Sequence, residues 1–155
     1  MDSGTGLARR RVGKAVGKMP RTMEHGSSPA APTVLLLPSD SSAPAAARAA
    51  IAELAGELPA DLLRNLSLVA TELVTNALVH AAVADPAPTM SVVITPSRVT
   101  LTVHDRGASF DLDAVFKQPG PSGGWGLRLV DSLVDRWRIE RPGGTRVVCE
   151  IDLRR

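Results

Sequence analysis

The stretch ATELVTNALVHAA, residues 70–82, combines an apolar helix with a column of polar side chains. Its leucines, valines and alanines would bury one side of a helix, whereas Glu72, Asn76 and His80 recur at steps of four. Four residues make about one helical turn, so these three side chains share one stripe of the helix surface. The helix is therefore expected to pack on a core and to present a carboxylate, an amide and an imidazole to something polar.

The composition predicts one domain with an aliphatic core. The chain has 155 residues, of which 44% are hydrophobic and only 3% are aromatic, with no tyrosine. This length is sufficient to bury a core. The single cysteine, Cys149, excludes an internal disulfide, fits the reducing cytoplasm and is expected to be inert core. No apolar run is expected to reach the ~20 residues of a membrane span, and no membrane association is predicted.

The positive charge is concentrated near the amino terminus. Residues 1–26 contain six basic and two acidic side chains, net +4, whereas the remainder contains 12 basic and 14 acidic side chains, net −2. Residues 1–32 are rich in Gly, Pro and Ser, which predicts a disordered basic tail preceding a domain at 33–155. A solvated arm without a specific partner is favoured, because the tail lacks interleaved aromatic residues. A DNA-binding regulator that uses this tail is a weaker alternative, and direct nucleic-acid binding is not expected.

Hydrophobic periodicity predicts the element order β-α-α-β-β-loop-α-β-β. The order has too few parallel crossovers for a doubly wound sheet. It favours an α+β two-layer sandwich, with a mostly antiparallel mixed sheet and about three helices on one face. The predicted elements are a short buried strand at 33–37, helices at 41–58 and 61–84, strands at 90–95 and 98–104, an irregular stretch at 106–123 with one helical turn near 112–116, a helix at 124–136, and a hairpin of strands 137–141 and 145–153.

Two further polar residues are predicted on buried strand faces. The alternation of strand 98–104 places Asp105 on the apolar face, and Thr145 begins the odd-numbered apolar row of the last strand. His104 falls on the opposite face and is expected to be exposed. Burying an unpaired polar group costs roughly 2–7 kcal/mol, which is large beside a domain stability of ~5–15 kcal/mol. A bound ligand is therefore expected to satisfy these groups.

Glycines accompany these positions. Gly107 follows Asp105 in DRG, and GPSGGWGLRLV (120–130) places Gly124 and Gly126 at the start of the predicted third helix. A glycine-rich segment that leads into a helix amino terminus suits a phosphate group, although this signal alone is weak. The segment lacks the Gly-Lys-Ser/Thr step of a P-loop.

Four motifs in order resemble the GHKL, or Bergerat-fold, ATP-binding domain. They are E-x3-N on a helix, D-x-G after a strand, G-x-G-L at a helix start and G-T at a strand start. TELVTNALVHA and GGWGLRLVDSLVDRW are similar to the anti-sigma factor serine/threonine kinase branch, the RsbW-like group. The resemblance covers about residues 38–153, and its strength lies in the order of four weak motifs. Ser109 departs from it, because the family usually has a second glycine there.

The resemblance implies ATP and Mg²⁺ as cofactors and gives roles to the polar column. Asn76 matches the asparagine whose amide oxygen ligates Mg²⁺, and Glu72 matches the general base one turn earlier. His80 either lines the phosphate end or bonds backbone. In the alternative without a ligand, Asn76 bonds a neighbouring carbonyl and Glu72 forms an ordinary salt bridge.

The resemblance also implies an adenine side and a phosphate side. Asp105 matches the aspartate that accepts a hydrogen bond from the adenine amino group, and Gly107 leaves room for the base. Thr145 would support the same contact through water. Backbone N–H groups would bind the phosphates at Gly124, Gly126 and Leu127.

Two functions from different classes are compatible with these residues. The first is a bacterial, cytoplasmic serine protein kinase of the anti-sigma type, which regulates transcription by binding a sigma factor and phosphorylating a STAS-type anti-anti-sigma partner. The alternative is a non-catalytic ATP-binding module that switches partner binding without phosphotransfer. A homodimer is an expectation by resemblance only.

Overall fold

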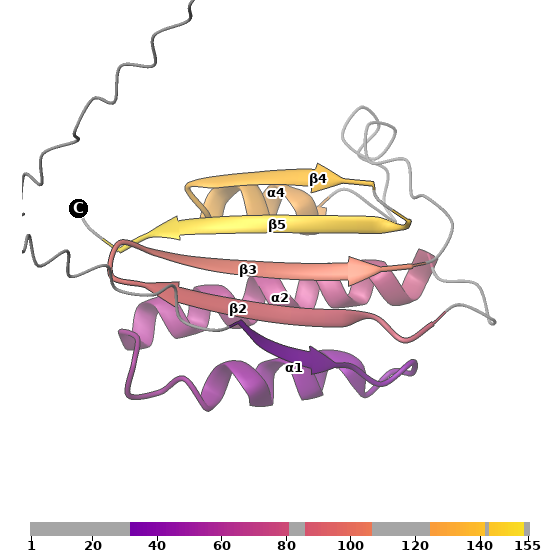
Figure 1. The fold of residues 1–155 in the computed structure, drawn as a ribbon, viewed down its shortest axis with the longest axis horizontal. Coiled ribbons are helices and arrows are strands. Elements are labelled where there is room, and N and C mark those ends of the chain that lie inside the picture. Colours follow the sequence, from indigo (N-terminus) through magenta and orange to yellow (C-terminus); the bar gives the residue numbers. More distant parts are fainter. Residues whose placement is uncertain (1–31, 81–85, 107–124, 142, 154–155) are drawn as a thin grey trace, which may run out of the picture.

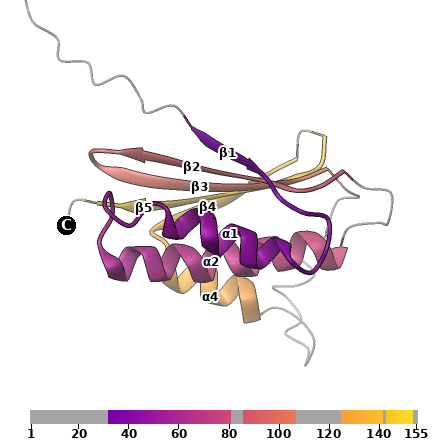
Figure 2. The same cartoon turned by 90° about the horizontal axis from the view of Figure 1, so that it is seen from below.

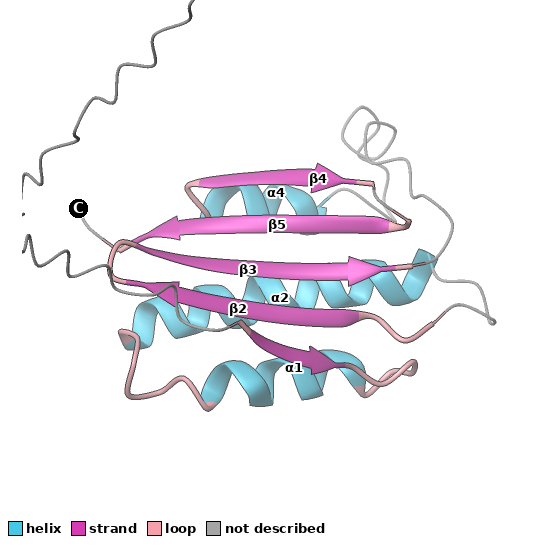
Figure 3. Ribbon diagram, in the orientation of Figure 1, coloured by secondary structure: helices cyan, strands magenta, loops and turns pink. Residues whose placement is uncertain are grey.

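The computed structural model describes residues 32–80, 86–106, 125–141 and 143–153, which form eight helices and strands (Figures 1 and 3). The basic tail, the predicted turn near 112–116, Gly107 and Gly124 lie outside these residues. The elements are β1 (Thr33–Leu36), α1 (Ala43–Ala52), α2 (Ala60–His80), β2 (Thr89–Thr95), β3 (Arg98–Asp105), α4 (Trp125–Leu133), β4 (Arg136–Glu140) and β5 (Thr145–Asp152).

The strands form one five-stranded sheet in the order β1-β2-β3-β5-β4. All four pairings among these strands are antiparallel. Helices α1, α2 and α4 lie on one face of the sheet, with α2 between the other two (Figure 2). The predicted α+β class with helices layered on one face is confirmed.

The core lies between the helices and the odd-numbered side chains of β3 and β5. Strand β3 alternates strictly between half-buried and buried residues, as period-2 geometry requires. Helix α2 contributes the opposing apolar stripe at the spacing of an amphipathic helix. The buried side chains of α2 are Leu66, Val69, Ala70, Leu73 and Val74. Each large aliphatic side chain buried in this way stabilises the fold by about 1.5–3 kcal/mol.

Two predictions are wrong: the burial of the first strand and the end of the first helix. Strand β1 is at the sheet edge, so it is not the predicted buried strand: Val34 is 65% exposed and Leu36 is 69% exposed, whereas Leu37, just after the strand, is 2% exposed. Helix α1 ends at Ala52, well before Pro59. After Ala52 the backbone forms 3₁₀-type turns, in which the amide of Ala55 donates to the carbonyl of Ala52 at 3.0 Å.

The face of the sheet away from the helices carries ion pairs that join β3, β5 and β4. Arg136 donates to Asp152 at 2.7 Å, and Arg138 donates to Glu150 at 3.0 Å. The hydrogen bond from Arg136 lowers the pKa of the Asp152 carboxyl. The arginines of these pairs are exposed, so the pairs fix the strand register more than they add stability.

Helix α2 has the length and composition of a membrane-crossing helix. Residues Ala60–Val79 have a mean hydropathy of 1.2, and 33% of that window is buried within the structure. The expectation that no apolar run reaches the length of a span therefore does not hold for this segment. In the structure, its buried stripe packs against the sheet, as it does in the core helix of a globular domain.

Candidate functional site

Asp105 and Thr145 lie opposite each other where β3 ends and β5 begins. They are partners in the antiparallel register, and each residue is only 7% exposed. The Thr145 Oγ1 atom is buried and has no hydrogen-bond partner among the residues that the structure describes. An unsatisfied buried hydroxyl costs about 1–3 kcal/mol. The pair thus contains a polar atom that a ligand or a bound water would satisfy.

Glycine brings these two strand ends together. Gly144 has φ +132, and a Cβ atom there would collide with the Asp105 carbonyl oxygen and lie 2.7 Å from the Arg106 Cα. Only a residue without a side chain permits this approach at that φ. Gly144 was not among the predicted site residues, although it is the glycine of the G-T motif that precedes Thr145.

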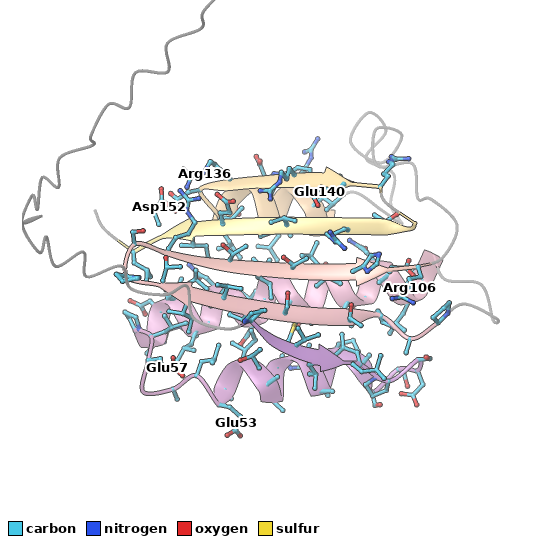
Figure 4. The ribbon with its side chains drawn as sticks, in the orientation of Figure 1. Glu53, Glu57, Arg106, Arg136, Glu140 and Asp152 are labelled. Atoms are coloured by element: carbon cyan, nitrogen blue, oxygen red, sulfur yellow. The ribbon has the colours of Figure 1, made fainter. Side chains whose placement is uncertain are left out.

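The polar column of α2 has the predicted spacing. Glu72 and Asn76 are half-buried, and His80 is the last described residue of α2, with its side chain outside the described part. Figure 1 shows the carboxyl ends of α2 and β3 and the amino end of β5 at the same end of the molecule. Arg106 also lies at this end, opposite to Arg136 and Asp152 (Figure 4). The column therefore leads toward the Asp105–Thr145 pair.

Helix α4 meets the column at Glu72. The Oε2 atom of Glu72 occupies the space that a Cβ at Gly126 would need, and its Cδ atom lies 3.4 Å from that position. Leu127, the next residue, is 2% exposed and belongs to the core. The structure thus joins Glu72 to Gly126 and Asp105 to Thr145. The roles of these residues toward a nucleotide stay predictions.

A Mg²⁺ ion at Asn76 would need oxygen donors from the protein, from phosphates or from water. The described residues include no group of three or more His, Cys, Asp or Glu side chains that could hold a metal ion. A protein cage for a metal is therefore not formed by this part of the chain. A single amide oxygen, at Asn76, fits the pattern in which Mg²⁺ keeps several waters and is held mainly by substrate phosphates.

His104 was expected to be exposed, and Cys149 was expected to be buried. His104 lies on the outer face as predicted but is half-buried, so the expected exposure is wrong. Burial, followed by Arg146 and Arg106, lowers the pKa of His104. Cys149 is buried core, where burial raises its pKa to about 12. This confirms that Cys149 is part of the core.

The chain is similar in sequence to proteins of known function. The chain is 32% identical over 100 residues to the serine-protein kinase RsbW of Bacillus licheniformis, and 30% identical over 100 residues to that of Bacillus subtilis (strain 168). Each alignment covers 56% of this chain and 62% of the relative, so the chain spans less than two thirds of the length of these curated relatives.

The fold is similar to a crystal structure of the RsbU and RsbW domains of a Mycobacterium tuberculosis protein. The TM-score is 0.61 at 22% identity, over 80% of this chain and 33% of that one. The family described as "Histidine kinase-like ATPase domain" matches residues 37–151, which is most of the chain. Because this match covers most of the chain, the chain belongs to the histidine kinase-like ATPase domain family.

Proposed function

We propose that this chain is an ATP- and Mg²⁺-binding serine protein kinase of the anti-sigma type, acting in the bacterial cytoplasm. The observation that carries the proposal is the Asp105–Thr145 pair, which is buried and contains a hydroxyl without a partner among the described residues. An adenine ring supplies the complement of this pair, because its amino group donates to a carboxylate. Membership of an ATPase domain family supports the same nucleotide.

The polar column would carry the chemistry. Glu72 would accept the proton of the attacking serine hydroxyl, whose oxygen forms the new bond to the γ-phosphorus. ADP would leave with the electron pair of the broken P–O bond. The amide oxygen of Asn76 would hold Mg²⁺, which when bound supplies neutralisation of the phosphate charge. Thr145 Oγ1 would gain its missing hydrogen bond on the adenine side, directly or through water.

The partners are proposed from the resemblance and from the relatives. Two relatives at 30–32% identity are serine-protein kinases, which supports phosphoryl transfer to a protein serine. The proposed acceptor is a STAS-type anti-anti-sigma protein, and the proposed binding target is a sigma factor. Transcription would then be regulated by which of the two the kinase holds.

The test is phosphoryl transfer from γ-³²P-labelled ATP, with Mg²⁺, to purified STAS-domain proteins of the source genome. The wild-type chain should label one acceptor on serine. Glu72→Ala should lower the rate by about 10²–10⁴-fold, the usual range for loss of a general base. Glu57→Ala is the matched control, because Glu57 is an exposed glutamate in the segment that follows α1 (Figure 4).

Two results would contradict the proposal. Unchanged transfer by Glu72→Ala would remove Glu72 from the base role. ATP-dependent capture of a partner without any labelling would instead favour a binding module that does not transfer phosphate.

A further inference from the structure

Glu72 and Gly126 are 54 positions apart in sequence but share one space in the fold. The Glu72 carboxylate, from α2, lies where a side chain at position 126 of α4 would begin. The Glu72 Cβ and Cδ atoms are 3.7 Å and 3.4 Å from the Cβ position of a residue there, which is ordinary contact. The close approach is therefore confined to the carboxylate oxygen.

The Glu72 carboxylate lies beside the first described turn of α4. Gly126 is the second described residue of α4, and the first described turn of α4 contains no acidic residue of its own. The amino end of a helix carries a partial positive charge and unpaired N–H groups.

We propose that Gly126 is a positioning residue for Glu72: the absence of a side chain at Gly126 leaves the space in which α4 holds the carboxylate that accepts the serine proton. This inference rests on the proposed function, because it concerns the same proton acceptor. It adds that the location of the base depends on α4, the helix that begins just after the glycine-rich segment. The resemblance gives Gly126 a different role, a backbone contact to phosphate.

The two roles predict different effects of Gly126→Ala. Alanine is a better helix former than glycine, so α4 should persist. The new methyl group would meet the far end of a flexible side chain, so the Glu72 carboxylate would be displaced while both helices remain in place. Displacement of a catalytic group by about 1 Å costs on the order of 10²-fold in rate. A glycine needed for phosphate contact would instead affect ATP affinity.

The experiment compares Gly126→Ala with Gly56→Ala in the full chain. Gly56 is the matched control, because a Cβ there meets nothing within 4 Å. Calorimetry with Mg·ATP should give dissociation constants for both variants within about threefold of the wild type, whereas kcat for transfer to the acceptor should fall by about 10²-fold in Gly126→Ala only. A weakened ATP affinity with unchanged kcat would overturn the proposal and assign Gly126 to the phosphates.

A second readout does not depend on transfer. In protein labelled with ¹³C at the glutamate carboxyl carbons, the Glu72 resonance is identified by its loss in Glu72→Gln. It should shift in Gly126→Ala and stay in place in Gly56→Ala. A Glu72 resonance that is unmoved in Gly126→Ala would refute the positioning role, even if the chain proved not to be a kinase. A shift without any phosphotransfer would retain the contact and refute the proposed function instead.

A third comparison tests whether the two residues act through one another. Glu72→Asp retracts the carboxylate by one methylene and should slow transfer in the wild-type background. In the Gly126→Ala background, the shorter side chain avoids the new methyl group, so its additional effect should be smaller than in the wild type. Independent effects that multiply would contradict the coupling.

Discussion

Replacing Thr145 by valine is expected to change stability and nucleotide affinity in opposite directions. The buried Oγ1 atom has no hydrogen-bond partner among the described residues, and valine replaces it with a methyl group of similar shape. Removing an unsatisfied buried hydroxyl should stabilise the nucleotide-free protein by about 1–3 kcal/mol. For a domain of this size, 1 kcal/mol corresponds to a rise in melting temperature of roughly 4 °C.

The same substitution should weaken ATP binding. If Thr145 gains its hydrogen bond only when the nucleotide is present, valine removes that bond from the complex. A typical hydrogen bond contributes about 0.5–1.5 kcal/mol, so the dissociation constant for ATP should rise by about 2–12-fold. Thermal unfolding without nucleotide and calorimetric titration with Mg·ATP measure the two effects on the same preparation.

Thr95→Val provides the comparison for a hydroxyl that already has a partner. Thr95 Oγ1 donates to the Arg98 carbonyl at 3.0 Å, so its removal should destabilise the protein by about 1 kcal/mol and leave ATP affinity unchanged. A nucleotide-free Thr145→Val protein that melts below the wild type would refute the reasoning about the unsatisfied hydroxyl. Unchanged ATP affinity would separate Thr145 from the nucleotide.

Three other outcomes can be measured. Gly144→Ala should destabilise the protein by at least about 1–3 kcal/mol in urea unfolding, because φ +132 strains any side chain and its Cβ would strike the Asp105 carbonyl; an unchanged midpoint would contradict the observed approach of the strand ends. Asp105→Asn should raise the dissociation constant for ATP by about 10–100-fold through loss of a charged hydrogen-bond acceptor, whereas equal losses for ATP and GTP would argue against adenine recognition. Burial raises the pKa of the Cys149 thiol from 9.0 to about 12, so its contribution to stability is full below pH 9.0 and declines toward pH 12. Iodoacetamide should therefore modify Cys149 only when the protein unfolds, as followed by mass spectrometry.

Local geometry determines which parts of this structure were predictable. The inward position of Asp105 follows from period-2 alternation in β3, and the column of Glu72 and Asn76 follows from the helical repeat. Both are properties of a single element. The exposure of β1 was not predictable from its apolar letters, because burial there depends on the edge position of the strand in the finished sheet. The turn after α1 was missed because Leu54 continues the helical period beyond the last helical residue.

The other features of the site depend on contacts between elements that lie far apart in the sequence. The contact of Glu72 with Gly126 arises from the packing of α2 on α4, and the sequence contains no sign that these two residues meet. The register that pairs Asp105 with Thr145 depends on the alignment of two strands that are separated by α4 and β4. Motif order predicted that these residues share a site, but the contacts themselves required coordinates.

The position of β5 has a consequence for biosynthesis. It is the last of the described strands in the chain, yet it lies between β3 and β4 and is bonded to both. Residues 145–152 must therefore leave the ribosome before the centre of the sheet can form. Until then, the edge of β3 that pairs with β5 has no partner strand. Asp105 meets Thr145 only when β5 has joined β3, so under the proposed function the capture of ATP by nascent chains would report the closing of the sheet.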